Sequence, residues 1–279
     1  MLTDGNEGPP VYLCQVGEGV SCGACCGLYN IAGLSRPALE ERLARRTRRF
    51  AEAARSEDGL EAFRRATVGW TPEERPFPQF HHCPFLGLIG QEATRVGCLL
   101  HPESPGNEGR DWRILSYYGA EACASYFCPA SRCLPPRHLQ ILPSLFDDWY
   151  PYGLIVTEHR LVGAVFTELE GLVARAVGPD DFPRFSTSAA CLRELLELKL
   201  VWPYRHEDAP GPCHFPFDNG LYPRPELRWP SKRRPIPPYV TILQEMESQL
   251  ATTAERDNAI ALLDSHFTNI VDCLGKAPA

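Results

Sequence analysis

The chain has 279 residues, enough to bury one large hydrophobic core or two smaller ones. Apolar residues make up 44% of the sequence and charged residues 23%, a balance typical of globular proteins that excludes global disorder. The formal net charge is −7, so nucleic acid and anionic membranes should repel the molecule as a whole. We therefore expect neither of them as a partner.

The N-terminal sequence and the cysteine content together favour a cytoplasmic, metal-binding protein. The segment MLTDGNEGPPVYLCQ lacks the basic start and the apolar run of a secretory signal. No apolar stretch is long enough to predict a membrane-spanning helix. In a reducing compartment, the twelve cysteines of this chain would serve metal binding or redox chemistry rather than structural disulfides.

The first predicted helix covers residues 36–55. Ser35 is a suitable N-cap, and Leu39, Leu43 and Phe50 recur on one side at helical spacing. The other side is rich in arginine, which predicts a solvated face or, alternatively, a surface for phosphate or an acidic protein partner; its arginines are Arg42, Arg45, Arg46, Arg48 and Arg49. A second short helix is predicted over residues 60–67.

The second half of the sequence is predicted to be mainly helical. Apolar residues recur at spacings of three and four in several segments; these are residues 165–176, 189–201, 241–250 and 253–274. In the last segment Ile260, Leu263, Phe267 and Ile270 form one stripe, which predicts that they are buried. Residues 152–157 (YGLIVT) are the best candidate for a strand.

Cysteine and proline divide the chain unevenly. Nine of the twelve cysteines lie between Cys14 and Cys133. Residues 209–238 contain nine prolines, which exclude a helix and favour an extended strap or a semi-rigid linker. We therefore predict a mainly α protein with an irregular, cysteine-rich metal-binding region over 1–140 and a helical region over 141–279.

The densest chemical signal is the segment SCGACCG, which contains Cys22, Cys25 and Cys26. The two-residue spacing of Cys22 and Cys25 lets both sulfurs of one tight turn reach a single metal centre. Gly23, between the two cysteines, and Gly27, after them, give the backbone the freedom that such a turn needs. Cys26 points in another direction than Cys25, so it can bind the same centre only if the chain curls around it.

Further thiols follow in HHCPFLG, VGCLLHP and GAEACASYFCP; they are Cys83, Cys98, Cys123 and Cys128. A buried thiolate is costly unless a positive charge neutralises it, and a metal both lowers the thiol pKa and supplies that charge. Four thiolates suffice for a structural zinc ion or a four-iron cluster, and six to eight permit two centres. The spacing leaves the choice between zinc and iron open, along with the roles of Cys14 and Cys133.

These motifs resemble the zinc- or iron-chelating CxxCxxCC family, also called YkgJ-like, over roughly residues 14–133. In that family a cysteine run ending in CGxCC is followed by CPxL, then a single cysteine in an apolar context, then a later cysteine. The resemblance implies that the metal ligands are Cys22, Cys25, Cys26, Cys83, Cys98 and Cys123. Cys128 is a further candidate in place of Cys14, because seven residues separate Cys14 from Cys22.

Two functions follow from these patterns. Family members include proteins similar to a lysine N-methylase that modifies flagellin, so the resemblance implies a cluster-dependent redox or protein-modifying enzyme with a protein substrate. The alternative is a non-enzymatic interaction module that zinc stabilises. Three histidines near the cysteines, His81, His82 and His101, are possible nitrogen ligands, whereas Cys191 and Cys273 fall within helical patterns and are predicted to be core residues.

Overall fold

The computed structural model describes residues 11–29, 35–67, 82–90, 92–207, 227 and 238–275. Within these ranges the chain is mainly helical, which confirms the predicted class. The elements are η1 (Ala24–Cys26), α1 (Arg36–Glu52), α2 (Glu57–Thr67), β1 (Leu86–Ile89), β2 (Arg95–Cys98), η3 (Arg113–Leu115), α3 (Gly119–Ser125), α4 (Pro129–Cys133), α5 (Pro136–Leu145), α6 (Trp149–Val156), α7 (His159–Val173), η4 (Pro179–Asp181), α8 (Thr187–Val201), α9 (Val240–Glu245) and α10 (Thr253–Gly275). None of these helices combines the length and the apolar composition needed to cross a membrane.

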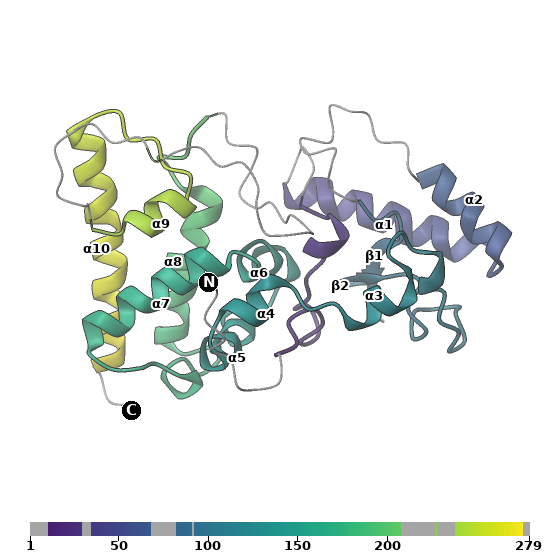
Figure 1. Cartoon of the computed structure of the whole chain (residues 1–279), viewed down its shortest axis with the longest axis horizontal. Coiled ribbons are helices and arrows are strands. Elements are labelled where there is room, and N and C mark those ends of the chain that lie inside the picture. The colour runs from purple at the N-terminus through teal and green to yellow at the C-terminus, as the bar shows by residue number, and fades with distance from the viewer. Residues whose placement is uncertain are drawn as a thin grey trace.

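Helices α4 to α10 gather at one end of the molecule, and α1, α2, α3 and the two strands lie at the other (Figure 1). One hydrophobic core extends through both ends, since it contains Leu39 of α1 together with Phe166 of α7 and Phe267 of α10. A smaller core around Phe63 lies beside α2. The predicted division at residue 140 falls within α5 and stays a prediction.

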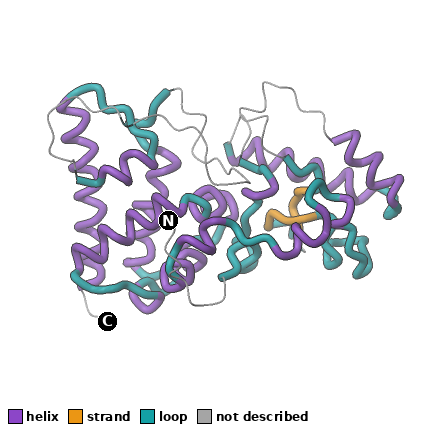
Figure 2. The backbone as a smooth tube through the Cα atoms, in the orientation of Figure 1, coloured by secondary structure: helices purple, strands orange, loops and turns teal. Residues whose placement is uncertain are grey.

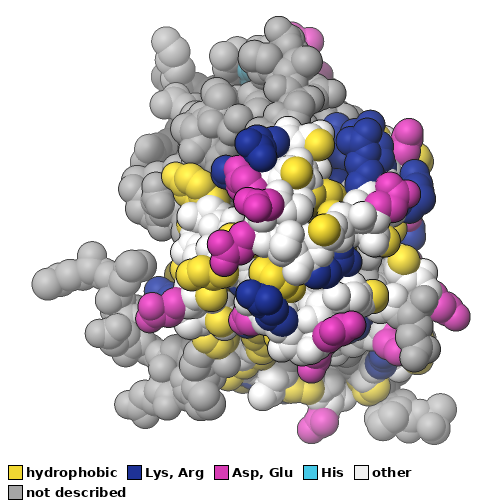
Figure 3. Space-filling view, turned by 90° about the vertical axis from the view of Figure 1, so that its right-hand side faces the viewer, with side chains coloured by type: hydrophobic (Ala, Val, Ile, Leu, Met, Phe, Trp, Pro, Cys, Tyr) yellow, Lys and Arg dark blue, Asp and Glu magenta, His cyan; other side chains and the backbone are white. Residues whose placement is uncertain are grey.

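Helix α1 begins where the sequence predicts, with Ser35 in the N-cap position and a proline in the first turn. Leu39, Leu43 and Phe50 are buried as expected. Arg46, which the sequence places on the solvent face, is buried among them, because its guanidinium donates to the carbonyl oxygens of Cys83 (3.2 Å) and Leu86 (3.4 Å). Around α2, cationic and anionic side chains lie next to each other on the molecular surface (Figure 3).

The only strands among the described residues form a hairpin that the sequence analysis does not predict (Figure 2). Strands β1 and β2 pair antiparallel, with Leu86 opposite Cys98 and Gly87 opposite Gly97. A Cβ atom on Gly87 would lie 2.6 Å from the Thr47 hydroxyl, so the absence of a side chain at residue 87 lets α1 approach the hairpin closely. Four-residue strands with central glycines are too short and too weakly patterned for a period of two to reveal them.

Residues 152–157, predicted as a strand, belong instead to helix α6, so that prediction is wrong. The Asp148 side chain accepts a hydrogen bond from the Tyr150 amide (2.7 Å) and caps the helix. All but two residues of α6 are buried. A helix that is apolar on every side lacks the 3.6-residue period that distinguishes it from a buried strand.

Gly153 of α6 lets Tyr29 of the N-terminal segment pack closely against this helix. A Cβ atom built there would lie 2.0 Å from the hydroxyl oxygen of the buried Tyr29, and this hydroxyl donates to the Trp149 carbonyl (3.3 Å). We expect Gly153→Ala to destabilise the fold by about 1–3 kcal/mol through overpacking, despite the better helix propensity of alanine. Gly171→Ala on α7, where a Cβ meets open space, should instead stabilise it by about 0.5–1 kcal/mol. Urea denaturation of both variants checks this difference, and a stabilised Gly153→Ala protein would contradict the contact.

The helices of the second half confirm most of the predicted segments. Segments 165–176, 189–201 and 253–274 correspond to α7, α8 and α10, whereas 241–250 gives only the short helix α9. In α10, Leu263, Phe267 and Ile270 are buried as predicted, but Ile260 is half-buried and Ala259 takes its place in the core. The proline-rich segment 209–238 falls almost entirely outside the described residues.

A buried lysine joins three helices of this half. Lys199 of α8 is 1% exposed; its ammonium group donates to the Glu245 carbonyl at the end of α9 and lies 3.6 Å from the Glu158 carboxylate before α7. The hydrogen bond and the ion pair offset the cost of removing the charge from water. The apolar periodicity of α8 gives no sign of this contact.

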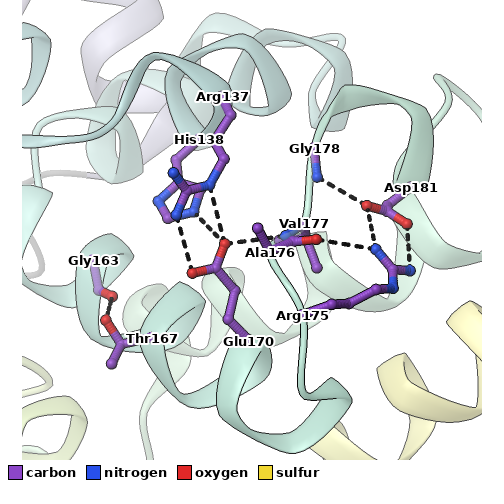
Figure 4. A network of polar contacts seen from close by, with 10 residues as sticks. All are labelled: Arg137, His138, Gly163, Thr167, Glu170, Arg175, Ala176, Val177, Gly178 and Asp181. Carbon is purple, nitrogen blue, oxygen red and sulfur yellow. Dashed lines mark hydrogen bonds and ion pairs between the residues drawn. The ribbon is translucent and has the colours of Figure 1, made fainter. Parts of the chain in front are cut away.

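A carboxylate network ties α5 to α7 (Figure 4). Glu170 of α7 accepts hydrogen bonds from Arg137 (3.1 Å) and the Val177 amide (3.1 Å), and its Oε1 lies 3.0 Å from Nε2 of His138. Burial alone would raise the pKa of Glu170, but these hydrogen bonds outweigh it and lower that pKa to about 2. His138 in turn stacks on Phe166, with ring centroids 4.1 Å apart.

This network predicts a pH dependence of stability. Because the pKa of Glu170 is lower in the folded chain than in the unfolded chain, its stabilising contribution is complete above about pH 5 and is lost as pH falls toward 2. Glu170→Gln should therefore be less stable than the parent protein at pH 7, with a gap that closes between about pH 5 and pH 2. Urea denaturation across that range measures the gap, and a difference that does not vary with pH would contradict the assignment.

Candidate metal centre

The segment SCGACCG forms a single tight turn whose glycines have distinct roles. Residues Ala24–Cys26 form the 3-10 turn η1, which Gly27 ends in the left-handed conformation, with φ of 82°. Gly23 lies so close to the hairpin that a Cβ there would be 2.9 Å from the Val96 side chain. The turn therefore packs directly against β2, the strand that ends in Cys98.

Backbone hydrogen bonds bring distant cysteines to this turn. The amide of Cys22 donates to the Cys14 carbonyl (2.9 Å), and the amide of Cys83 donates to the Cys26 carbonyl (2.8 Å). Cys98 pairs with Leu86 across the hairpin, and Leu86 is only three residues after Cys83 in the sequence. Segments far apart in the sequence thus meet around residues 22–26.

Side-chain interactions link eight thiols, which we describe as two connected groups of four. In the first thiol group (Cys14, Cys22, Cys25 and Cys128), Cys22 interacts electrostatically with the other three. In the second thiol group (Cys26, Cys83, Cys98 and Cys123), Cys26 is hydrogen-bonded to Cys83, and Cys98 interacts with Cys83 and Cys123. The groups are connected: the side chains of Cys25 and Cys26 are hydrogen-bonded, and Cys25 also interacts electrostatically with Cys83 and Cys123.

Local contacts hold several of these thiols. Helix α6 lies beside the first thiol group, because the Cys22 sulfur is 3.9 Å from the Gly153 carbonyl oxygen and the Tyr152 hydroxyl donates to the Leu13 carbonyl (2.9 Å). In the second thiol group, the Cys123 sulfur lies 3.1 Å from the Ser116 hydroxyl. Seven of the eight side chains are buried or half-buried, including that of Cys128 at the start of α4, whereas Cys123 is exposed.

Burial is the largest influence on the pKa of most of the eight thiols. Burial raises the pKa of Cys14, Cys22, Cys123 and Cys128, and it raises the pKa of Cys98 to about 12. The hydrogen bond between Cys25 and Cys26 lowers the pKa of Cys25 and raises that of Cys26, so Cys25 accepts and Cys26 donates. The thiols whose pKa is raised keep their protons at neutral pH unless a cation compensates for their charge.

Two arginines supply positive charge beside the second thiol group. Arg46 interacts electrostatically with Cys83 and Cys26; burial lowers its pKa to about 10, so it stays charged at neutral pH. Arg113 interacts electrostatically with Cys98 and Cys123. Neither arginine could be identified from the sequence as part of the site, since Arg46 is one of five similar arginines and Arg113 lies in no motif.

Other candidates from the sequence lie apart from the eight thiols or have different contacts. Cys133 is exposed at the end of α4. The ring Nδ1 of His101 accepts a hydrogen bond from the Glu103 amide (3.3 Å), a local turn contact. His81 and Cys213 fall outside the described residues. Cys191 and Cys273 are half-buried on α8 and α10 and contact each other.

A cavity of about 760 Å³ opens beside α1, and its lining contains no cysteine. It is acidic, with Glu40, Asp147 and Asp148 among its carboxylates. Arg36 spans it, pairing with Glu40 (2.7 Å) and Asp148 (2.5 Å). Asp148 also caps α6, so its carboxylate has a structural role.

The donor chemistry of the eight thiols fits a soft or borderline metal, since thiolates are the preferred ligands of zinc and of iron–sulfur clusters. In the conformation of the described residues, no three or more histidine, cysteine, aspartate or glutamate side chains are placed to hold one ion together. Binding would therefore require the thiols to lose protons and turn toward a common point.

Comparison of the chain with models of protein families, with curated proteins and with solved structures finds no match.

Proposed function

We propose that this protein binds an iron–sulfur cluster on cysteine thiolates gathered around the turn at residues 22–26. The observation that supports the proposal is that eight interacting thiols come from separate segments of the chain, two of which, at Cys14 and Cys83, are tied to that turn by backbone hydrogen bonds. The ligands would come from Cys22, Cys25, Cys26, Cys83, Cys98, Cys123 and Cys128, with Cys14 as an eighth candidate. A structural site of this size would use most of the half-buried thiols in the described chain.

Two nearby positive charges favour a cluster that draws some of its ligands from the second thiol group. Several thiolates around iron leave a net negative charge, which Arg46 and Arg113 would neutralise from the protein side. Such a cluster, when bound, supplies one-electron transfer, which suits a redox or protein-modifying enzyme of the cytoplasm. The exposed arginines of α1, Arg45, Arg48 and Arg49, offer a surface for an acidic partner or protein substrate.

The test is anaerobic purification of the full chain, followed by metal analysis and an absorption spectrum. We expect bound iron, inorganic sulfide and a brown colour with absorption near roughly 400 nm. A colourless protein that contains zinc would overturn the cluster in favour of a zinc-stabilised interaction module. A fully folded protein without either metal, before and after anaerobic reconstitution, would overturn metal binding altogether.

Two double variants test whether the metal binds at the turn around residues 22–26. Cys22→Ser/Cys25→Ser should lower the bound metal by more than half and destabilise the N-terminal region, because ligand loss removes folding free energy together with the ion. Cys191→Ser/Cys273→Ser is the matched control, because it removes two half-buried thiols far from the turn and should leave the metal content unchanged. Full metal loading and stability in the first variant would contradict the proposal.

Cys26→Ser distinguishes one centre from two. Since Cys26 belongs to the second thiol group, it should spare a centre on the first thiol group and abolish one on the second. If there are two centres, Cys26→Ser and Cys22→Ser/Cys25→Ser should each keep the metal of the centre that they do not touch, whereas complete loss of metal in both variants would indicate one centre shared by all three cysteines.

A further inference from the structure

Two cysteines that lie far from the metal candidates contact each other between α8 and α10. The sulfur atoms of Cys191 and Cys273 are 3.5 Å apart, although 82 positions separate the residues in the sequence. Both side chains are half-buried, so small molecules in solution can reach them. From the sequence each is predicted to be a separate core residue, because no local pattern shows that the two helices bring these positions together.

The helices pack antiparallel at this contact (Figure 1). Cys191 lies in the second turn of α8 and Cys273 in the last turn of α10. One turn further along α8, Glu194 interacts electrostatically with His266, two turns earlier in α10. The thiol pair therefore sits at one end of a continuous helix–helix interface.

We propose that Cys191 and Cys273 form a reversible redox pair whose disulfide fastens the last turn of α10 to α8. A disulfide requires sulfurs about 2 Å apart, so the 3.5 Å contact must shorten by about 1.5 Å. Rotation of the two side chains and a small shift of the last turn of α10 can supply this change, since the final carbonyls of a helix lack intrahelical partners that would hold them.

The oxidant is a small-molecule disulfide such as oxidised glutathione, and the reaction is thiol–disulfide exchange. One protein thiol loses its proton and attacks the small disulfide, which breaks its S–S bond and releases one small thiol. The second protein thiol then loses its proton and attacks the mixed disulfide, releasing another small thiol. Two electrons and two protons thus pass from the cysteine pair to the oxidant, which is reduced to two thiols.

The surroundings of the pair suit a slow, lasting crosslink rather than fast catalysis. Burial, together with the hydrogen bond that the Cys191 thiol makes to Cys273 and the nearby Glu194 charge, raises the pKa of Cys191 to about 11. Little of its thiolate is present at neutral pH, so exchange is slow in both directions. Once formed, the disulfide closes a long loop of the chain and restricts the unfolded state.

The test uses the full chain, reduced and then equilibrated with mixtures of reduced and oxidised glutathione. Peptide mapping without reductant should find the Cys191–Cys273 crosslinked peptide in most molecules under oxidising mixtures. The oxidised protein should melt roughly 5 °C or more above the reduced protein, and reductant should reverse the shift. Cys191→Ser and Cys273→Ser should each abolish the crosslink and the shift, whereas Cys133→Ser, at an exposed thiol, should abolish neither.

Three outcomes would overturn the proposal: no reaction at either cysteine, stable mixed disulfides with glutathione in place of the crosslink, or a crosslink that lowers the melting temperature. The proposal does not depend on metal binding, because the pair shares no residue with the eight thiols near the turn. Metal content measured on the same samples separates the two, since loss of the crosslink in Cys191→Ser should leave any bound metal in place.

Discussion

Phe267→Ala is expected to lower the free energy of unfolding by about 3–5 kcal/mol, because it removes a fully buried aromatic ring and leaves a cavity. Phe267 is 1% exposed in α10, where its ring stacks on Tyr239 with centroids 5.2 Å apart. It belongs to the same core as Phe166 of α7 and Leu192 of α8. Loss of the ring should therefore loosen α10 from several neighbouring elements at once.

Urea denaturation followed by circular dichroism measures this effect, with Phe185→Ala as the matched control. Phe185 is 84% exposed, so the same change there should alter the unfolding free energy by no more than about 0.5 kcal/mol. Similar losses in the two variants would show that burial of α10 contributes little to stability.

Arg46→Met should cost about 2–4 kcal/mol, because it removes a charged donor from two buried carbonyls and keeps a side chain of similar length. Its guanidinium joins α1 to the Cys83 and Leu86 carbonyls on either side of the start of β1. Loss of these bonds should separate the hairpin from the helix and disturb Cys83, which is hydrogen-bonded to Cys26. We therefore expect lower metal content as well as lower stability.

Arg48→Met provides the control, since Arg48 lies exposed on the same helix and has the same chemistry. It should leave both stability and metal content nearly unchanged. Chemical denaturation and metal analysis of the two variants read out the difference. Equal behaviour of the two would mean that the buried contacts of Arg46 are energetically unimportant.

The long amphipathic helices could be predicted from the sequence because their signal is local. In α1 and α10 the apolar residues recur every three or four positions, and each helix needs only its own neighbours to bury that stripe. The turn around Cys22 and Cys25 is equally local, since Gly23 and Gly27 permit it. Helix α6 could not be predicted in this way, because it is buried on nearly all sides and has no apolar stripe.

The sequence by itself determined the mainly α class, the positions of the long helices and the cysteines that are candidates for ligands. Only the tertiary structure decided which of them meet: it places Cys14 and Cys128 with Cys22, and Cys83 and Cys98 with Cys26, and it brings Cys191 to Cys273. It also decided that Arg46 is buried beside Cys83 while Arg48 is exposed. The physical reason is that these outcomes depend on contacts between residues tens of positions apart, which the packing of helices and the hairpin creates and which no local period encodes.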